Sequence, residues 1–205
     1  MSAFRATAAV VRYQLDRRFA GELAITFALL LSATALFGNL LIWPAPREQF
    51  LALVVAILAS GELQWRLSPR IRDVLYFTLP LYGRQLARAY VVPMLLCAIA
   101  APLAVAGGGT LAHSEPRFGF TFVVCASLAG SIDGLIILSA AFREGAAAWL
   151  FRGLGFASGC AVGASLLAGK PLALPLAILT TLVLGFVALR QLGETIARFD
   201  SSPDC

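Results

Sequence analysis

The chain has 205 residues and a formal net charge of +5; 60% of its residues are hydrophobic, 13% are charged, and the mean hydropathy is +0.84. A soluble domain could not carry this much apolar surface in water, so the composition excludes one and predicts an integral membrane protein. Six helices of about 20 residues would fill most of this length, so we expect a single all-α transmembrane domain over residues 1–205 without a nucleic-acid partner.

The N-terminal segment, residues 1–22, has a helical pattern interrupted by arginines. Its apolar side chains recur every three or four residues, at Phe4, Ala8, Val11, Leu15 and Phe19. A helix with one apolar stripe and arginines off that stripe is suited to lie in the membrane interface. We therefore expect an interfacial helix on the cytoplasmic side, the alternative being an ordinary basic flank.

Six apolar segments follow, and we expect each to cross the membrane as a helix. They cover residues 23–42, 50–65, 91–107, 119–141, 149–168 and 172–189. A glycine-rich loop is expected after the third segment, and a tight turn at residues 169–171 between the fifth and the sixth.

The distribution of basic residues predicts the orientation. With the N-terminus in the cytoplasm, thirteen of the sixteen lysines and arginines fall in cytoplasmic segments; only Arg47, Arg117 and Lys170 fall outside. Cytoplasmic loops of membrane proteins are enriched in lysine and arginine. We therefore expect a multi-pass protein of a bacterial-type inner (plasma) membrane with both termini inside.

Residues 66–90, between the second and third segments, contain five arginines. Ser68 followed by Pro69 is typical of a helix start, because serine caps free backbone N–H groups and proline fits the first helical position. Leu79 before Pro80 is steered away from helical geometry. The pattern predicts a short cytoplasmic helix over residues 69–78, and such a helix needs a docking partner to be stable.

The run LYFTLPLYGRQLARAY, with its Leu79-Pro80 pair and Arg84, resembles the permease subunits of type-two ABC exporters. This resemblance implies a transporter subunit without enzymatic activity of its own. A separate ABC-type ATPase would hold ATP and magnesium, so no cofactor would bind this chain, and a second permease subunit, identical or homologous, would complete a dimer. The coupling helix would lie in the segment 67–84. Its contacts with the ATPase would come from Ile71, Val74, Leu75, Tyr76, Thr78, Leu79 and Pro80. The alternative for this segment is a solvated basic loop that only fixes topology.

Two acidic residues lie inside apolar segments, where an ionisable group is costly and faces protein or water. Asp133 is about 12 Å from the inner end of the fourth segment at 1.5 Å per residue. We consider it either a polar point on a substrate path or a structural partner of another span. Glu62 has Arg66 four residues later, the favourable order for a helical ion pair, which predicts a structural pair.

Glycines recur every four residues in two segments: Gly130 and Gly134 in the fourth, and Gly155, Gly159 and Gly163 in the fifth. Small residues at this spacing let helix backbones approach closely. We expect packing within one subunit, with a dimer seam as the alternative.

Two other functional classes stay open. One is the substrate-capturing membrane subunit of a vitamin-type importer, which has a similar length and number of spans. The other is an intramembrane enzyme, but Ser158 has no base near it in sequence, since His113 is the only histidine. The four cysteines form no cluster, so we expect neither a disulfide framework nor a metal site.

Overall fold

The computed structural model describes residues 17–40, 45–76, 83–113, 119–139 and 145–200, and within these ranges it contains helices and no strand. Its six helices are α2 (Arg17–Leu40), α3 (Ala45–Tyr76), α4 (Gly83–His113), α5 (Phe120–Ser139), α6 (Ala146–Leu167) and α7 (Ala173–Asp200). Each is long and apolar enough to cross a membrane. The predicted all-α fold with six membrane-spanning helices is therefore confirmed for the described residues.

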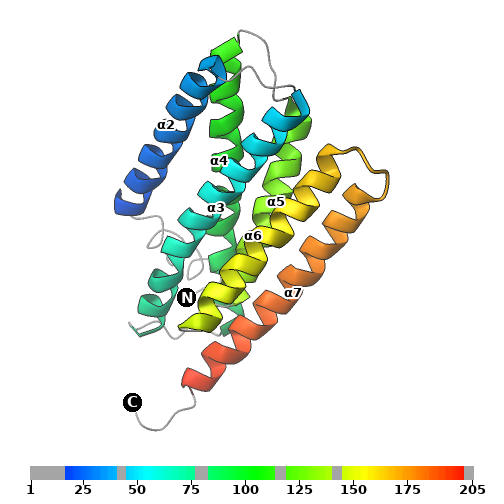
Figure 1. Cartoon of the computed structure of the whole chain (residues 1–205). Coiled ribbons are helices and arrows are strands. Elements are labelled where there is room, and N and C mark those ends of the chain that lie inside the picture. Colours follow the sequence, from blue (N-terminus) through cyan, green and yellow to red (C-terminus); the bar gives the residue numbers. More distant parts are fainter. Residues whose placement is uncertain (1–16, 41–44, 77–82, 114–118, 140–144, 201–205) are drawn as a thin grey trace.

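The six helices run alternately up and down, so that the start of α2 and the end of α7 lie at the same end of the bundle (Figure 1). Helices α3, α4 and α5 form the interior, and at least half of the apolar window of each is buried. Helices α2 and α7 are mostly exposed along their apolar windows, and leucines such as Leu29 and Leu182 point outward. This inverted exposure of apolar side chains is what a lipid solvent requires.

The main apolar core lies where α3, α4, α5 and α6 meet. Leu53 and Ile57 of α3 are fully buried there against Phe122 and two alanines of α5, with Phe156 of α6 packed alongside. Small residues dominate because helix association in lipid depends on close packing rather than on the hydrophobic effect. Three of the cysteines, Cys97, Cys125 and Cys160, are free thiols among the described residues.

The glycine rows pack inside this one chain. A Cβ built at Gly159 would lie 3.0 Å from the backbone oxygen of Ala129 on α5, and one at Gly163 would lie 2.8 Å from the side chain of Leu53 on α3. Gly155, Gly159 and Gly163 are all buried. The row on α6 is therefore used for packing within this chain, and the alternative of a dimer seam stays a hypothesis.

The helix ends differ from the sequence prediction at the start of the chain and after the second span. Helix α2 begins at Arg17, so residues 17–22 of the expected interfacial segment belong to the first membrane helix, and residues 1–16 lie outside the described residues. Helix α3 continues through Ser68 and Pro69 to Tyr76, so no separate helix starts there. A proline removes one helical hydrogen bond without having to end the helix, and α4 likewise runs through two prolines.

The predicted coupling residues are only partly described. Ile71, Val74, Leu75 and Tyr76 belong to the backbone of α3, whereas Thr78, Leu79 and Pro80 lie outside the described residues.

The glycine-rich loop predicted after the third span does not begin at the glycines, because α4 runs through residues 107–109 as a helix to His113; residues 114–118 lie outside the described residues. A Cβ at Gly108 would lie 2.5 Å from the backbone oxygen of Leu31, so this glycine lets α2 pack directly on α4. The turn predicted at residues 169–171 is present, with Gly169 at a φ of 66° that favours glycine.

Candidate functional site: a polar layer in the membrane spans

Three polar side chains are buried in the interior of the described bundle: Ser60 and Gln64 of α3 and Asp133 of α5. Their exposed fractions are 0%, 1% and 2%. Ser60 and Gln64 lie one helical turn apart and therefore share a face of α3. We call these three residues the inner polar cluster. Asp133 is about 9 Å along the axis from the end of α5, well inside the membrane span.

Gln64 connects three helices. Its side-chain nitrogen Nε2 donates hydrogen bonds to the backbone oxygen of Met94 on α4, at 3.3 Å, and to that of Gly130 on α5, at 3.2 Å. Both amide hydrogens are thereby used, which fixes the orientation of the side chain. The bonds tie α3, α4 and α5 together at the level of the cluster.

Glycines make the space for these side chains. A Cβ built at Gly134 would lie 2.6 Å from Gln64 Nε2, and one at Gly130 would lie 3.1 Å from Ser60 Oγ. Asp133 sits between two further glycines: a Cβ at Gly61 of α3 would collide with its Oδ2, and one at Gly155 of α6 would lie 2.5 Å from its Oδ1. Gly130 and Gly134 thus accommodate polar side chains of α3, a role that the four-residue spacing alone does not indicate.

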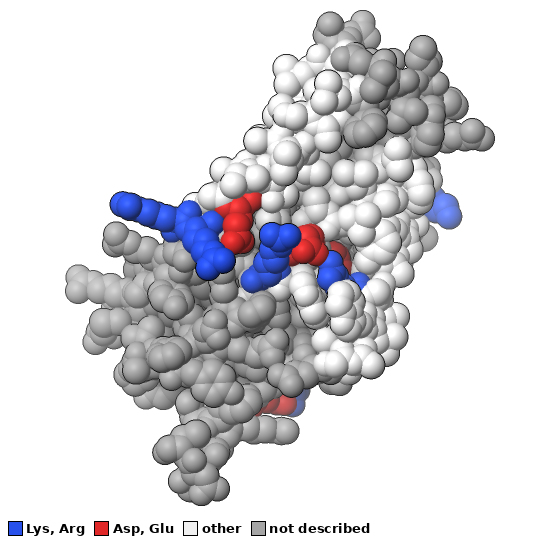
Figure 2. Space-filling view, turned by 60° about the vertical axis from the view of Figure 1, so that its left-hand side comes forward, with Lys and Arg blue, Asp and Glu red and all other residues white. Residues whose placement is uncertain are grey.

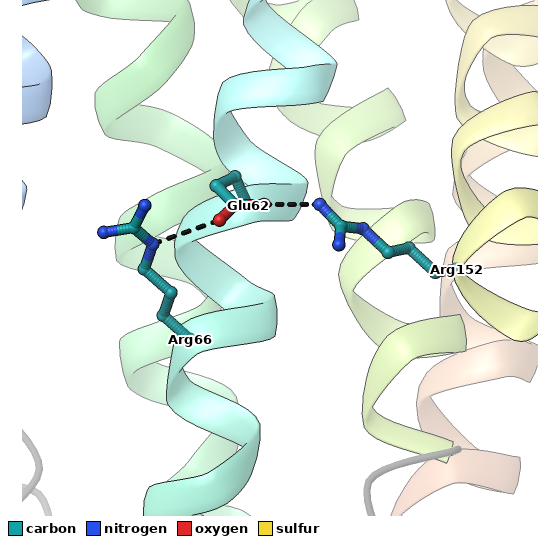
Figure 3. A network of polar contacts seen from close by, with 3 residues as sticks. All are labelled: Glu62, Arg66 and Arg152. Carbon is teal, nitrogen blue, oxygen red and sulfur yellow. Dashed lines mark hydrogen bonds and ion pairs between the residues drawn. The ribbon is translucent and has the colours of Figure 1, made fainter. Parts of the chain in front are cut away.

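A second, outer cluster of charged and aromatic residues lies at the edge between α3 and α6. Glu62 forms an ion pair with Arg66 of α3, at 3.1 Å between Oε1 and Nε, as its sequence spacing predicts. Arg152 of α6 reaches across to the other carboxylate oxygen of Glu62 (Figure 3). The Arg152 guanidinium carbon also lies 5.3 Å from the ring centre of Trp65 and 5.2 Å from that of Trp149. These contacts join α3 to α6 at the surface of the bundle.

Figure 2 shows a group of acidic and basic side chains at one level on this face of the molecule, with further charged side chains at its right edge and near its lower end. Glu62 is about 8 Å along the axis from the end of the apolar segment of α3, and Arg152 about 9 Å from the start of α6, close to the level of Asp133. Together the inner and outer clusters form a polar layer in the third of the spans nearest the end of α5 and the start of α6. Placing polar groups at this depth costs free energy, so such groups are rare in membrane spans and usually have a structural or functional role.

Sequence reasoning singled out Asp133, Glu62 and Arg66, and the structure brings the first two to the same level. It did not single out Ser60, Gln64 or Arg152. Their signal was present: Ser60 and Gln64 are polar residues four positions apart inside an apolar segment, and Arg152 lies inside another. The structure does not bring Ser158 close to His113, because Ser158 is about 14 Å along the axis from the C-terminal end of α6, whereas His113 ends α4 at that same end of the bundle (Figure 1).

The fold and the site define a class: a six-helix membrane protein with a buried polar layer near one end of its spans. No protein-family model matches the chain, and no curated protein or solved structure is significantly similar to it.

Proposed function

We propose that this chain is the membrane-spanning permease subunit of an ATP-driven transporter whose ATPase is a separate protein. The observation that carries the proposal is the projection of α3 and α4 beyond their apolar segments at the same end of the bundle. The apolar segment of α3 ends at Leu67 but the helix continues to Tyr76, about 13 Å further at 1.5 Å per residue. Helix α4 begins at Gly83, about 12 Å before its apolar segment starts at Val91.

This projection is suited to receive a force. An uninterrupted helix transmits a displacement along its axis better than a helix joined to a loop, and α3 is continuous from Ala45 to Tyr76. Gln64, which lies about 18 Å from Tyr76 along α3, bonds to the backbones of α4 and α5. A partner that moves the projecting end would therefore also move α4 and α5, and with them Asp133.

The orientation predicted from the basic residues places this projection in the cytoplasm, where an ATPase is available. In this proposal the coupling surface comprises residues 69–80, and Asp133 lies on the substrate path.

The test is co-purification with candidate ATPases encoded by neighbouring genes. Replacing Leu75 and Tyr76 by aspartate should leave membrane insertion intact but abolish ATPase association and the stimulation of ATP hydrolysis. Leu172→Asp is the matched control, since Leu172 is a 76% exposed leucine in the turn at the opposite end of the bundle. If the double variant still binds and stimulates the ATPase, the coupling assignment is refuted.

A second candidate function is supported by a pocket of about 380 Å³ at the outer ends of α5, α6 and α7. Phe120, Val124, Leu166 and Leu174 line it, and Lys170 provides a positive charge. A pocket on the outer side fits a subunit that captures an anionic small molecule before transport. Tight binding of such a ligand by the isolated chain, lost in Lys170→Ala, would favour this function over the permease.

A further inference from the structure

The inner polar cluster contains oxygens that have no hydrogen-bond partner among the described residues. They are Ser60 Oγ, Gln64 Oε1 and Asp133 Oδ1. All three side chains are at least 98% buried. A buried polar atom without a partner is rare in native proteins and calls for an explanation. Here three such atoms lie on one turn of α3 and on the facing part of α5, so we look for one explanation that covers all three.

The cluster has fewer free hydrogen-bond donors than acceptors. Gln64 has committed both amide hydrogens to the backbone oxygens of Met94 and Gly130. Its Oε1 accepts only, as does an ionised carboxylate oxygen of Asp133. Ser60 has a single hydrogen to donate. This one hydroxyl hydrogen cannot serve all three oxygens, so an added positively charged or hydrogen-donating partner would satisfy the others.

Ser60 differs from most hydroxyl residues in these helices. Thr34, Ser131 and Thr180 each donate to the carbonyl four residues earlier in their own helix. This is the usual way to satisfy a hydroxyl in a membrane helix. Ser60 Oγ instead faces α5, where Gly130 leaves room for it. The hydroxyl is thus directed toward the neighbouring helix on the same face of α3 as Gln64.

The charges that surround Asp133 are already engaged. Arg152 on α6 is paired with Glu62 of α3 and lies against two tryptophan rings. The other titratable groups on the described parts of these helices are Arg66 on α3, which also pairs with Glu62, Cys97 on α4, Cys125 on α5, Cys160 on α6 and, near the end of α7, Arg190 and Glu194, which pair with each other. No described lysine or arginine forms an ion pair with Asp133.

We propose that Ser60, Gln64 and Asp133 bind one positively charged ligand, a proton or a sodium ion, between α3, α5 and α6. A proton on Asp133 turns one of its acceptor oxygens into a donor. A sodium ion would be held by oxygens of the carboxylate, the amide and the hydroxyl, which are hard ligands suited to a hard cation. Either ligand cancels the carboxylate charge, whose burial in the membrane is otherwise costly. This site does not depend on the proposed ATPase.

The experiment measures the modification of Asp133 by dicyclohexylcarbodiimide, an apolar reagent that reacts with protonated carboxyl groups. The purified chain is labelled in detergent, and the adduct on the peptide containing Asp133 is quantified by mass spectrometry. One series raises the pH in choline chloride without sodium. The other replaces choline by sodium at constant pH and ionic strength.

The two ligands give different results. If sodium binds, sodium at about ten times its Kd should slow labelling about tenfold, because about one site in eleven then remains free, and choline should not. If only a proton binds, sodium and choline should give equal rates, and labelling should fall as the pH rises. Asp133→Asn must remove the adduct in both cases.

Variants test the other two residues. Gln64→Leu should weaken sodium protection about tenfold or more, or displace the pH of half-maximal labelling by about one unit, since each change corresponds to the loss of one hydrogen bond to a charged group. Ser60→Ala removes a single atom and serves if Gln64→Leu does not fold. Ser127→Ala is the matched control, because it also removes a buried hydroxyl without a hydrogen-bond partner, nearly two turns before Asp133 on α5.

Three results would overturn the proposal. Absence of labelling at Asp133 under all conditions would mean that the carboxylate stays ionised beside a charge of the protein itself, such as Arg152. Labelling that depends on neither pH nor sodium would mean a permanently neutral structural group. If Gln64→Leu and Ser60→Ala both behave like Ser127→Ala, the three residues do not form one site.

Discussion

Substituting Gly108 by alanine should separate α2 from α4. A Cβ at this position would lie 2.5 Å from Leu31 O, 2.7 Å from Thr34 Cβ and 3.1 Å from the nitrogen of Ala35. Favourable contacts between such atoms lie at about 3.5–4.0 Å, so the helices must move apart by about 1 Å. Two of the three atoms belong to the backbone of α2, and a change of side-chain rotamer therefore cannot relieve the collision.

The magnitude follows from two opposed effects. Overpacking a tight contact costs about 1–3 kcal/mol, whereas replacing a helical glycine by alanine gains about 1 kcal/mol in helix propensity. Gly107→Ala provides the matched control, because it has the same propensity gain, and its Cβ would meet only the side chain of Leu31, at 3.6 Å. The two variants should therefore differ in free energy of unfolding by about 1–3 kcal/mol.

The assay is thermal unfolding of both purified variants in one mild detergent. For a chain of this size each kcal/mol corresponds to about 2–4 °C in Tm, so Gly108→Ala should melt several degrees below Gly107→Ala. If Gly108→Ala melts at the same temperature as Gly107→Ala or above it, the direct contact between α2 and α4 at this position is refuted.

Two further predictions concern the charged residues. Arg152→Ala should lower the unfolding free energy by about 1–2 kcal/mol, because it removes a partly buried ion pair and two ring contacts. Arg66→Ala should lower it by no more than about 0.5 kcal/mol, since an exposed ion pair one turn apart contributes little. Equal losses of unfolding free energy in chemical denaturation would contradict this ranking. In a chain without its native cysteines, cysteines at Ala146 and Lys170, exposed positions at opposite ends of α6, should react with a membrane-impermeant maleimide from opposite sides, Lys170→Cys from outside. Labelling of Ala146→Cys in right-side-out vesicles would reverse the orientation predicted from the basic residues.

The number of membrane helices was predictable because hydropathy is a local property: each apolar segment reports its own burial in lipid without reference to its neighbours. Glu62 and Arg66 were predictable for the same reason, since both lie on one helix. Helix ends were less predictable. The local turn signals at Pro69 and at residues 107–109 were overridden, in the second case because α2 packs on the glycine surface of α4.

The inner polar cluster could be anticipated only in part. Asp133 is conspicuous in an apolar segment, but the partners that surround it come from α3 and α6, and no local pattern shows which faces of three helices meet. Gly61 and Gly155 are informative only after the structure places them on either side of the carboxylate. The sequence contained the residues of the site, whereas their association depends on the packing of helices that are distant in the chain.

The contact between α2 and α4 has a consequence for biogenesis. Of the six helices, α2 is made first, yet Gly108, the residue that lets its backbone pack closely on α4, is made about eighty residues after Leu31, at roughly 5–20 residues per second. For several seconds α2 must therefore remain in lipid without α4, its main packing partner, while α3, which lies between them in the chain, is made and inserted. Its almost entirely apolar surface is well suited to this interval. A nascent chain arrested before α4 should accordingly hold α2 as an independent membrane anchor.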